Sequence, residues 1–147
     1  MIIIYVVDIE KMNFNLIIFT EKTPSFYVEA RKEYEKRLGR FCKLKITCVK
    51  NAGKLQKALN PKYPVIVIDN CGSAVSSEEV AGIISAAENS GTSAVNVVIG
   101  YDISVEEKEA IRYSVSQFDL SSDLTAVIAL EQIYRAYKII SGETYHK

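Results

Sequence analysis

The chain contains one histidine and three cysteines among its 147 residues, and this scarcity argues against several kinds of site. With His146 as the single histidine, a histidine-based metal cluster or a Ser-His-Asp triad within one chain is disfavoured. Cys42, Cys48 and Cys71 are odd in number and lack Cys-x-x-Cys spacing, as is typical of reduced cytoplasmic thiols. We therefore expect no disulfide framework, no metal site and a cytoplasmic location.

Long apolar runs are also missing from the chain. The opening stretch has only six consecutive apolar residues, at positions 2–7. This run is too short to cross a bilayer, and no basic residue precedes it, as a signal peptide would require. Residues 1–11 are either an extra edge strand or a segment upstream of a true start at Met12. We expect an N-terminal extension over residues 1–11, a single domain over residues 12–147 and no membrane partner.

A net charge of either sign is absent, because 18 basic residues balance 18 acidic ones. The balance conceals two segments of opposite sign. Residues 31–62 contain eleven Lys and Arg against two Glu, whereas residues 63–131 contain two basic residues against eleven carboxylates. The basic segment is compatible with a polyanionic partner such as RNA, and equally with a solvated helix and loop surface.

The most prominent feature of the sequence is a long apolar segment near the end of the chain, which is predicted to form a helix. Ser121, Ser122 and Asp123 can each cap a helix, and Gly142 is the residue type favoured at a helix end. The helix expected over residues 124–140 is about 26 Å long. Its first half is apolar on every side, so it needs cover from its own sheet and from a second layer or a second subunit.

Apolar strands and amphipathic helices alternate along the rest of the chain. Strands are expected at residues 14–20, 43–49, 65–68, 95–99 and 115–120, and helices after Thr23-Pro24 and after the capping boxes Ser76–Glu79 and Ser104–Glu107, the last reaching Ser114. This order predicts an α/β fold with a mostly parallel sheet and helices on both faces. Ligands bind beyond the carboxyl ends of such strands, here near residues 69–73, 100–104 and 120–123.

Three segments of the chain resemble a known family. These are YRAYKIISGETYHK at the end, EYEKRLGRF at residues 33–41 and the frame VIVIDNCGSAVSSEEVA. They are similar to the SPOUT-class methyltransferases that methylate N3 of a pseudouridine in large-subunit ribosomal RNA, and the likeness runs from Met12 to Lys147. The resemblance implies a C-terminal trefoil knot, a homodimer, ribosomal RNA as partner and S-adenosylmethionine (SAM) held in the knot.

The resemblance also implies site residues. Cofactor contacts would fall on Ile68, on Gly100 and on a segment that wraps the adenine, comprising Val115, Ser116, Gln117, Phe118, Asp119 and Leu120. Without the resemblance, Ile68 and Val115 would be interpreted as core residues and Gly100 as a turn glycine. Arg135 in the last helix and Tyr145 and His146 in the tail would act on the substrate. Residue types alone also allow Arg135 to pair with Glu131, and a histidine near a chain end to be merely solvated.

The chain departs from the family pattern at three places. The glycine-rich loop of the family reads Gly100-Tyr101-Asp102 here, the Pro-His pair before the last helix is Ser121-Ser122, and an arginine in that helix is Ala126. Histidine and arginine are residue types suited to imide deprotonation or phosphate binding. Two hypotheses follow: a SAM-dependent ribosomal RNA methyltransferase, and a catalytically degenerate relative that acts as a dimeric RNA- or ribosome-associated protein.

Overall fold

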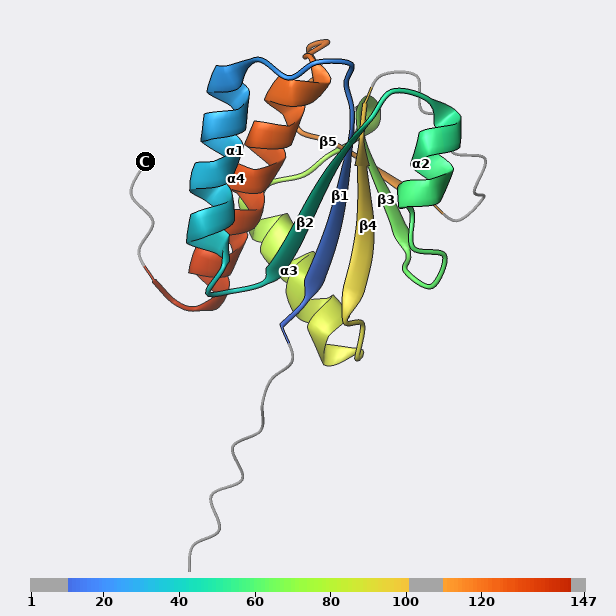
Figure 1. The fold of residues 1–147 in the computed structure, drawn as a ribbon. Coiled ribbons are helices and arrows are strands. Elements are labelled where there is room, and N and C mark those ends of the chain that lie inside the picture. Colours follow the sequence, from blue (N-terminus) through green and yellow to red (C-terminus); the bar gives the residue numbers. More distant parts are fainter. Residues whose placement is uncertain (1–10, 101–109, 144–147) are drawn as a thin grey trace, which may run out of the picture.

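A five-stranded parallel sheet forms the centre of the protein (Figure 1). The computed structural model describes residues 11–100 and 110–143. The strands are β1 (Asn13–Phe19), β2 (Lys43–Val49), β3 (Val65–Ala74), β4 (Ala94–Ile99) and β5 (Ile111–Ser114), in the spatial order β2-β1-β4-β3-β5. Every neighbouring pair is parallel, which confirms the predicted α/β class.

Helices cover both faces of this sheet (Figure 1). Three of them, α1 (Ser25–Leu38), α3 (Ser77–Asn89) and α4 (Ser122–Ile140), pack on one face, and the short α2 (Ala52–Ala58) lies on the other. Side chains alternate between the faces, so Leu16 packs beneath α4 while its neighbour Ile17 packs with Leu55 of α2. Burial on both faces explains why the central strands are continuous apolar runs.

Local capping signals fix the ends of α3 and α4 as predicted. Ser76 and Glu79 form a reciprocal capping box at the start of α3. The Ser121 hydroxyl accepts a hydrogen bond from the Leu124 N–H, and α4 begins two residues earlier than predicted. At its other end Gly142 adopts φ 72°, and the N–H of Glu143 donates to the carbonyl of Lys138. This Schellman geometry ends α4 and turns the chain back along its last turn.

Two expectations about residues 104–120 are wrong. The predicted helix to Ser114 does not hold over residues 111–114, which form β5, and the strand predicted at residues 115–120 is irregular chain. Residues 111–114 form a strand because Ile111 and Tyr113 pair with Ile66 and Ile68 of β3. This pairing is long-range, so a local sequence pattern does not predict it. The rest of the predicted helix, residues 104–109, lies outside the described residues. The knot depends on the path of residues 101–109, which are not described, so the trefoil knot remains a prediction.

The pairing of β3 with β5 is irregular next to the carboxyl end of the sheet. The register shifts between Ile68 and Ser73. Gly72 lies in this interval, and a Cβ placed on it would be 2.5 Å from the carbonyl carbon of Tyr113. Only glycine allows the two backbones to approach this closely. The interval displaces residues 69–71 from the regular strand, toward the site described below.

Helix α4 is covered unevenly within one chain. Ala126, Leu130 and Ala136 are fully buried between the sheet, α1 and α3. Ile139 and Ile140 are exposed, and Ile128 is half-buried. The chain therefore supplies the first layer of cover that the sequence predicts and leaves a second apolar side open. Within residues 11–100 and 110–143, none of the helices combines the length and the apolar character that crossing a membrane requires.

Candidate functional site

A pocket lies at the carboxyl end of β3 and β4, where the amino end of α4 begins. Its lining comes from three separate segments and comprises Ile68, Asp69, Asn70, Gly100, Val115, Ser116, Phe118, Asp119, Leu120, Ser122 and Thr125. Seven of the eight residues predicted to contact the cofactor therefore come together around one space. Gln117, the eighth, is exposed on the same loop and does not line it.

Serine side chains organise the loop after β5. The Ser114 hydroxyl donates to the carbonyl of Ser116 at 2.6 Å, and the Ser116 hydroxyl accepts from the N–H of Phe118 at 3.0 Å. Such side chain to backbone bonds stabilise a turn without a strand partner. The turn leaves the Phe118 ring 80% exposed at the rim of the pocket. The loop thus offers the pocket a fixed backbone and one projecting aromatic side chain.

Asp69 contributes a carboxylate that already has a cationic partner. Arg112 Nη1 lies 2.5 Å from Asp69 Oδ2, and the N–H of Cys71 donates to Oδ1 at 2.9 Å. The pair links the irregular part of β3 to β5. Because the Arg112 guanidinium offsets this charge, the exposed Asp119 is the lining carboxylate without such a close cation among the described residues.

The amino end of α4 is held by an interaction that the sequence analysis missed. Asp123 is buried, and its two carboxylate oxygens accept hydrogen bonds from the hydroxyls of Thr20 at 3.1 Å and Thr23 at 3.0 Å. Thr23 does not cap the helix that follows it, because Pro24 holds the N-cap position of α1 and no side chain caps that helix. The threonines follow β1, so they fix Ser122 and Thr125 relative to the carboxyl end of the sheet. An aspartate in the first turn of a helix was the only available signal.

The side chains that line the pocket fit a cofactor such as SAM, but the free volume of the pocket is small. Apolar side chains from Ile68, Val115 and Leu120 can face an adenine, the serine-rich turn offers polar atoms, and the Asp119 carboxylate suits a cationic group. The free space is about 20 Å³, enough for about one water molecule. Sites for ligands of drug size are typically about 300–1,000 Å³. The free space among the described residues is therefore smaller than a cofactor of this size.

The residues predicted to act on the substrate do not line this pocket in the described part of the chain. Arg135 lies on α4, ten positions after the lining residue Thr125, which is about 15 Å along the helix axis. Tyr145 and His146 lie outside the described residues. No group of His, Cys, Asp and Glu side chains within residues 11–100 and 110–143 has the arrangement of a metal site.

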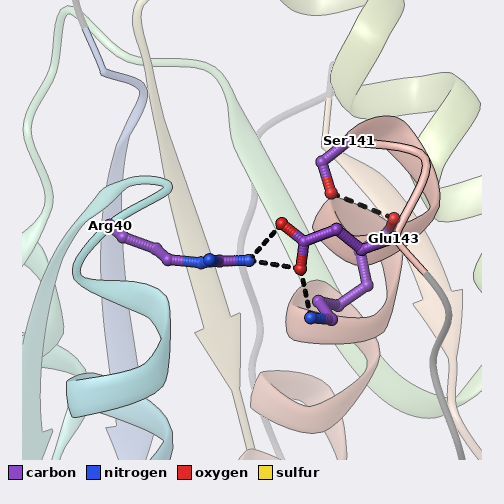
Figure 2. A network of polar contacts seen from close by, with 4 residues as sticks. Arg40, Ser141 and Glu143 are labelled. Atoms are coloured by element: carbon purple, nitrogen blue, oxygen red, sulfur yellow. Dashed lines mark hydrogen bonds and ion pairs between the residues drawn. The ribbon is translucent and has the colours of Figure 1, made fainter.

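The chain just before the tail is anchored at the opposite end of α4 from the pocket (Figure 2). Arg40 Nη2 donates to both carboxylate oxygens of Glu143, at 2.6 and 2.5 Å, and Lys138 forms an ion pair with the same carboxylate. Hydrogen bonds from Lys138 and Arg40 lower the pKa of Glu143. The Ser141 hydroxyl donates to the carbonyl of Lys138. These contacts hold Glu143, the last described residue, against the end of α4.

The positions that depart from the family pattern have structural roles here. Ser121 caps α4, and Ser122 lines the pocket. Ala126 is fully buried, so the wall of the helix at this point contains no charged group. Tyr101 and Asp102 lie outside the described residues.

Comparison with known proteins gives the same family as the three sequence segments. The model of a family described as "Predicted SPOUT methyltransferase" matches residues 12–146. The chain is 40% identical over 136 residues to "Ribosomal RNA large subunit methyltransferase H 1" of Thermoanaerobacter sp. (strain X514), covering 92% of this chain and 100% of that protein.

Two further relatives have names of the same kind. "Ribosomal RNA large subunit methyltransferase H" of Acetivibrio thermocellus is 33% identical over 160 residues, with 92% of this chain and 100% of the relative covered. The protein of that name from Thermotoga sp. (strain RQ2) is 34% identical over 142 residues, covering 85% and 93%. The match extends over most of each protein, and the family model spans the segments that form the pocket. The chain therefore belongs to the SPOUT methyltransferase family.

Proposed function

We propose that the protein transfers a methyl group from SAM to large-subunit ribosomal RNA, at N3 of a pseudouridine. The observation that carries this proposal is the convergence of Ile68, Gly100 and the loop of residues 115–120 on one pocket at the carboxyl end of a parallel sheet. The names of the relatives support ribosomal RNA as the substrate class. The active domain would comprise residues 12–147 and would work in the cytoplasm, with ribosomes.

SAM, when bound, supplies an electrophilic methyl group on a sulfonium. The chain's own residues have other tasks. Ile68, Val115 and Leu120 would enclose an adenine and exclude water from it, while Gly100 permits close approach of the backbone. Asp119 would lie near the cationic part of the cofactor, where an anion is favourable. Because the Asp123 carboxylate fixes Ser122 at the lip of the pocket, this edge is positioned before any ligand arrives.

The protein would work as a homodimer in which each tail completes the partner's site. Thr125 at the pocket and Lys138 at the anchored end are thirteen positions apart on α4, about 20 Å along its axis. From Glu143, which binds Lys138, three fully extended residues reach about 11 Å. This reach is shorter than the distance along α4, which supports a partner subunit as the source of the tail at each pocket. A partner subunit could bring Tyr145 and His146 there, and could bring Arg135 as well.

The second candidate function is that of a catalytically inactive RNA- or ribosome-binding dimer. Three observations favour it: the free space of only about 20 Å³, Ser122 in place of a histidine, and a buried Ala126 in place of an arginine. In this case the protein would retain the dimer and its RNA contacts but would not bind the cofactor.

Two measurements on the full chain separate the candidates. Calorimetry with SAM should show one site per chain, and ribosomes from a strain without this methylation should incorporate labelled methyl groups. Ile68→Trp, which fills the pocket, should abolish binding, whereas Phe26→Trp on the exposed surface of α1 should not. Absence of SAM binding at millimolar concentration would reject the methyltransferase, and dimers that still bind RNA would then support the second function.

A further inference from the structure

A second and larger cavity lies on the opposite face of the sheet, beside α2. It has a volume of about 580 Å³ and is lined by Asn13, Phe14, Asn15, Lys43, Leu44, Lys45, Ala58, Leu59, Asn60, Pro61, Lys62 and Tyr63. We call it the lysine basin. Its floor is the amino-terminal half of β1 and β2, and its wall is the loop after α2. It shares no lining residue with the pocket at the carboxyl end of the strands.

The basin carries positive charge without compensation. Lys43 and Lys45 belong to the edge strand β2, in register with Asn13 and Asn15, and Lys62 projects from the wall. No Asp or Glu lines the basin, and none of the three ammonium groups has an ion-pair partner among residues 11–100 and 110–143. By contrast, Arg37 pairs with Glu33 and Arg40 with Glu143. The basic segment is therefore partly neutralised on α1 and directly after it, but not in the basin.

Buried amide side chains build the wall of the basin. Asn96 is completely buried in the central strand β4, where an apolar residue would ordinarily stand. Its amide nitrogen donates to the carbonyls of Asn60 and Tyr63, and its oxygen accepts from the Asn60 N–H and from the Asn15 side chain at 2.7 Å. All four hydrogen-bonding capacities of the Asn96 amide are used. The loop that carries Lys62 is thus fixed by a side chain from inside the sheet.

One polar atom of this arrangement lacks a hydrogen-bond partner within the described part of the chain, which lowers stability. Such a loss indicates that the shape of the site matters for function. Asn15 also donates to the carbonyl of Ala58, but its Oδ1 is buried without a donor among the described residues. An unsatisfied buried acceptor typically costs about 1–3 kcal/mol. Some polar residues inside a sheet hold a loop in a particular shape at the expense of stability. Such residues are typical of functional sites. The Asn60 side-chain oxygen also accepts a hydrogen bond from the N–H of Lys62 at 3.0 Å.

We propose that the lysine basin binds the sugar–phosphate backbone of RNA, at a distance from the reacting base. Lys43 and Lys45 are two residues apart on one strand face, about 7 Å, which suits successive phosphates of one strand. Exposed lysines bind phosphates as point charges and carry no sequence information. The inference rests on the proposed RNA substrate. The basin and the cofactor pocket lie toward opposite ends of strands about 20 Å long, so an RNA that contacts both extends well beyond the target nucleotide.

The test compares two triple variants of the full chain in binding to a fragment of large-subunit ribosomal RNA, without SAM. K43Q/K45Q/K62Q removes the basin charges, and K32Q/K36Q/K54Q removes three exposed lysines elsewhere. We expect the basin variant to lower the slope of log K against log salt by about two, given about 0.7 per lost phosphate contact with single-stranded RNA. The control variant should retain most of the wild-type slope.

A second measurement does not depend on variants. Lysine acetylation read by mass spectrometry should show protection of Lys43, Lys45 and Lys62 when RNA is added. Equal losses of slope in both triple variants, unprotected basin lysines or a wild-type chain that does not bind RNA would each overturn the proposal. Neither readout uses SAM, so the two proposals can fail separately. If the chain binds RNA through the basin but transfers no methyl group, the proposed reaction is rejected and the proposed RNA-binding role of the basin is retained.

Discussion

Gly72 of β3 lies against the backbone of Tyr113 in β5, with room for a hydrogen but not for a side chain. A Cβ at residue 72 would be 2.5 Å from the Tyr113 carbonyl carbon and 2.7 Å from its nitrogen. The contact involves two backbones, so neither partner can rotate away. It fixes the spacing of the two strands that carry Ile68 and the loop after Ser114 into the pocket at the carboxyl end of the sheet.

Gly72→Ala should therefore destabilise the protein and weaken SAM binding together. Overpacking of this kind typically costs about 1–3 kcal/mol, measurable by urea unfolding. Gly82 is the matched control, because it lies in α3 with nothing within 4 Å of an added Cβ. Gly82→Ala should raise stability by about 0.5–1 kcal/mol. Equal stability of the two alanine variants would contradict the close approach at Gly72.

Asp123→Ala should loosen the amino end of α4. It leaves the hydroxyls of Thr20 and Thr23 without their acceptor, at a cost of about 1–3 kcal/mol. Asp119→Ala, on the exposed loop beside it, should change stability by less than about 0.5 kcal/mol. A double-mutant cycle of Asp123→Ala with Thr23→Val measures the pair directly. Additive effects in that cycle would show that the hydrogen bond contributes nothing.

Ile128→Asp should dissociate the proposed dimer without unfolding the chain. Ile128 is half-buried and lines an apolar groove of about 190 Å³ with Val75, Val80 and Tyr113. Covering this groove with a second subunit would bury the isoleucine, and a charge there would lie unpaired in the interface. Light scattering should report a monomer with normal circular dichroism. Phe26→Asp, at an exposed position on α1, should remain dimeric.

Mixing two inactive variants should restore activity if the tail serves the partner subunit. One variant carries Leu120→Glu in the pocket, and the other lacks residues 144–147. After subunit exchange at equal amounts, half of the dimers are mixed, and each mixed dimer has one intact site. Activity should recover to about a quarter of the wild-type value. A mixture as inactive as its components would show that each tail acts within its own chain.

Thiol reactivity should separate Cys42 from the other cysteines. Burial raises the pKa of the Cys42 thiol to about 12, so at pH 8 it stays protonated and unreactive. Cys48 and Cys71 are exposed and should react with a disulfide reagent in the native protein. Since the folded chain keeps this proton while an unfolded chain releases it near pH 9, the contribution to stability is lost as the pH rises from 9 toward 12. Rapid labelling of all three thiols in native protein would contradict the burial of Cys42.

The features that could be predicted from the sequence are those encoded locally. Ser76 and Glu79 specify the start of α3 by themselves, and the apolar runs of β1 and β4 reflect burial on both faces. The strand Ile111–Ser114 escaped prediction because only its pairing with β3 makes it a strand. The capping-box pattern at Ser104 predicted a helix there from local signals alone.

The candidate site shows the same division between local and distant information. The pocket residues were predicted from family resemblance, and residue types alone would have assigned Ile68 and Val115 to the core. The contacts of Asp123 with Thr20 and Thr23 join residues about a hundred positions apart and have no sequence signature. Asn96 inside an apolar run was visible, but its four hydrogen bonds to distant segments were not.

The position of Lys43 and Lys45 on an outer strand has a consequence for self-association. β2 ends the sheet, and a sheet edge offers unpaired N–H and C=O groups to any other strand. Lysines on an edge strand oppose such strand addition, because two copies approaching there would bring like charges together and desolvate them. Continuous sheets and fibrils built through β2 are thereby disfavoured. The proposed dimer would instead use apolar side chains exposed elsewhere, such as Ile111 on the opposite edge strand β5 or Ile139 and Ile140 at the end of α4.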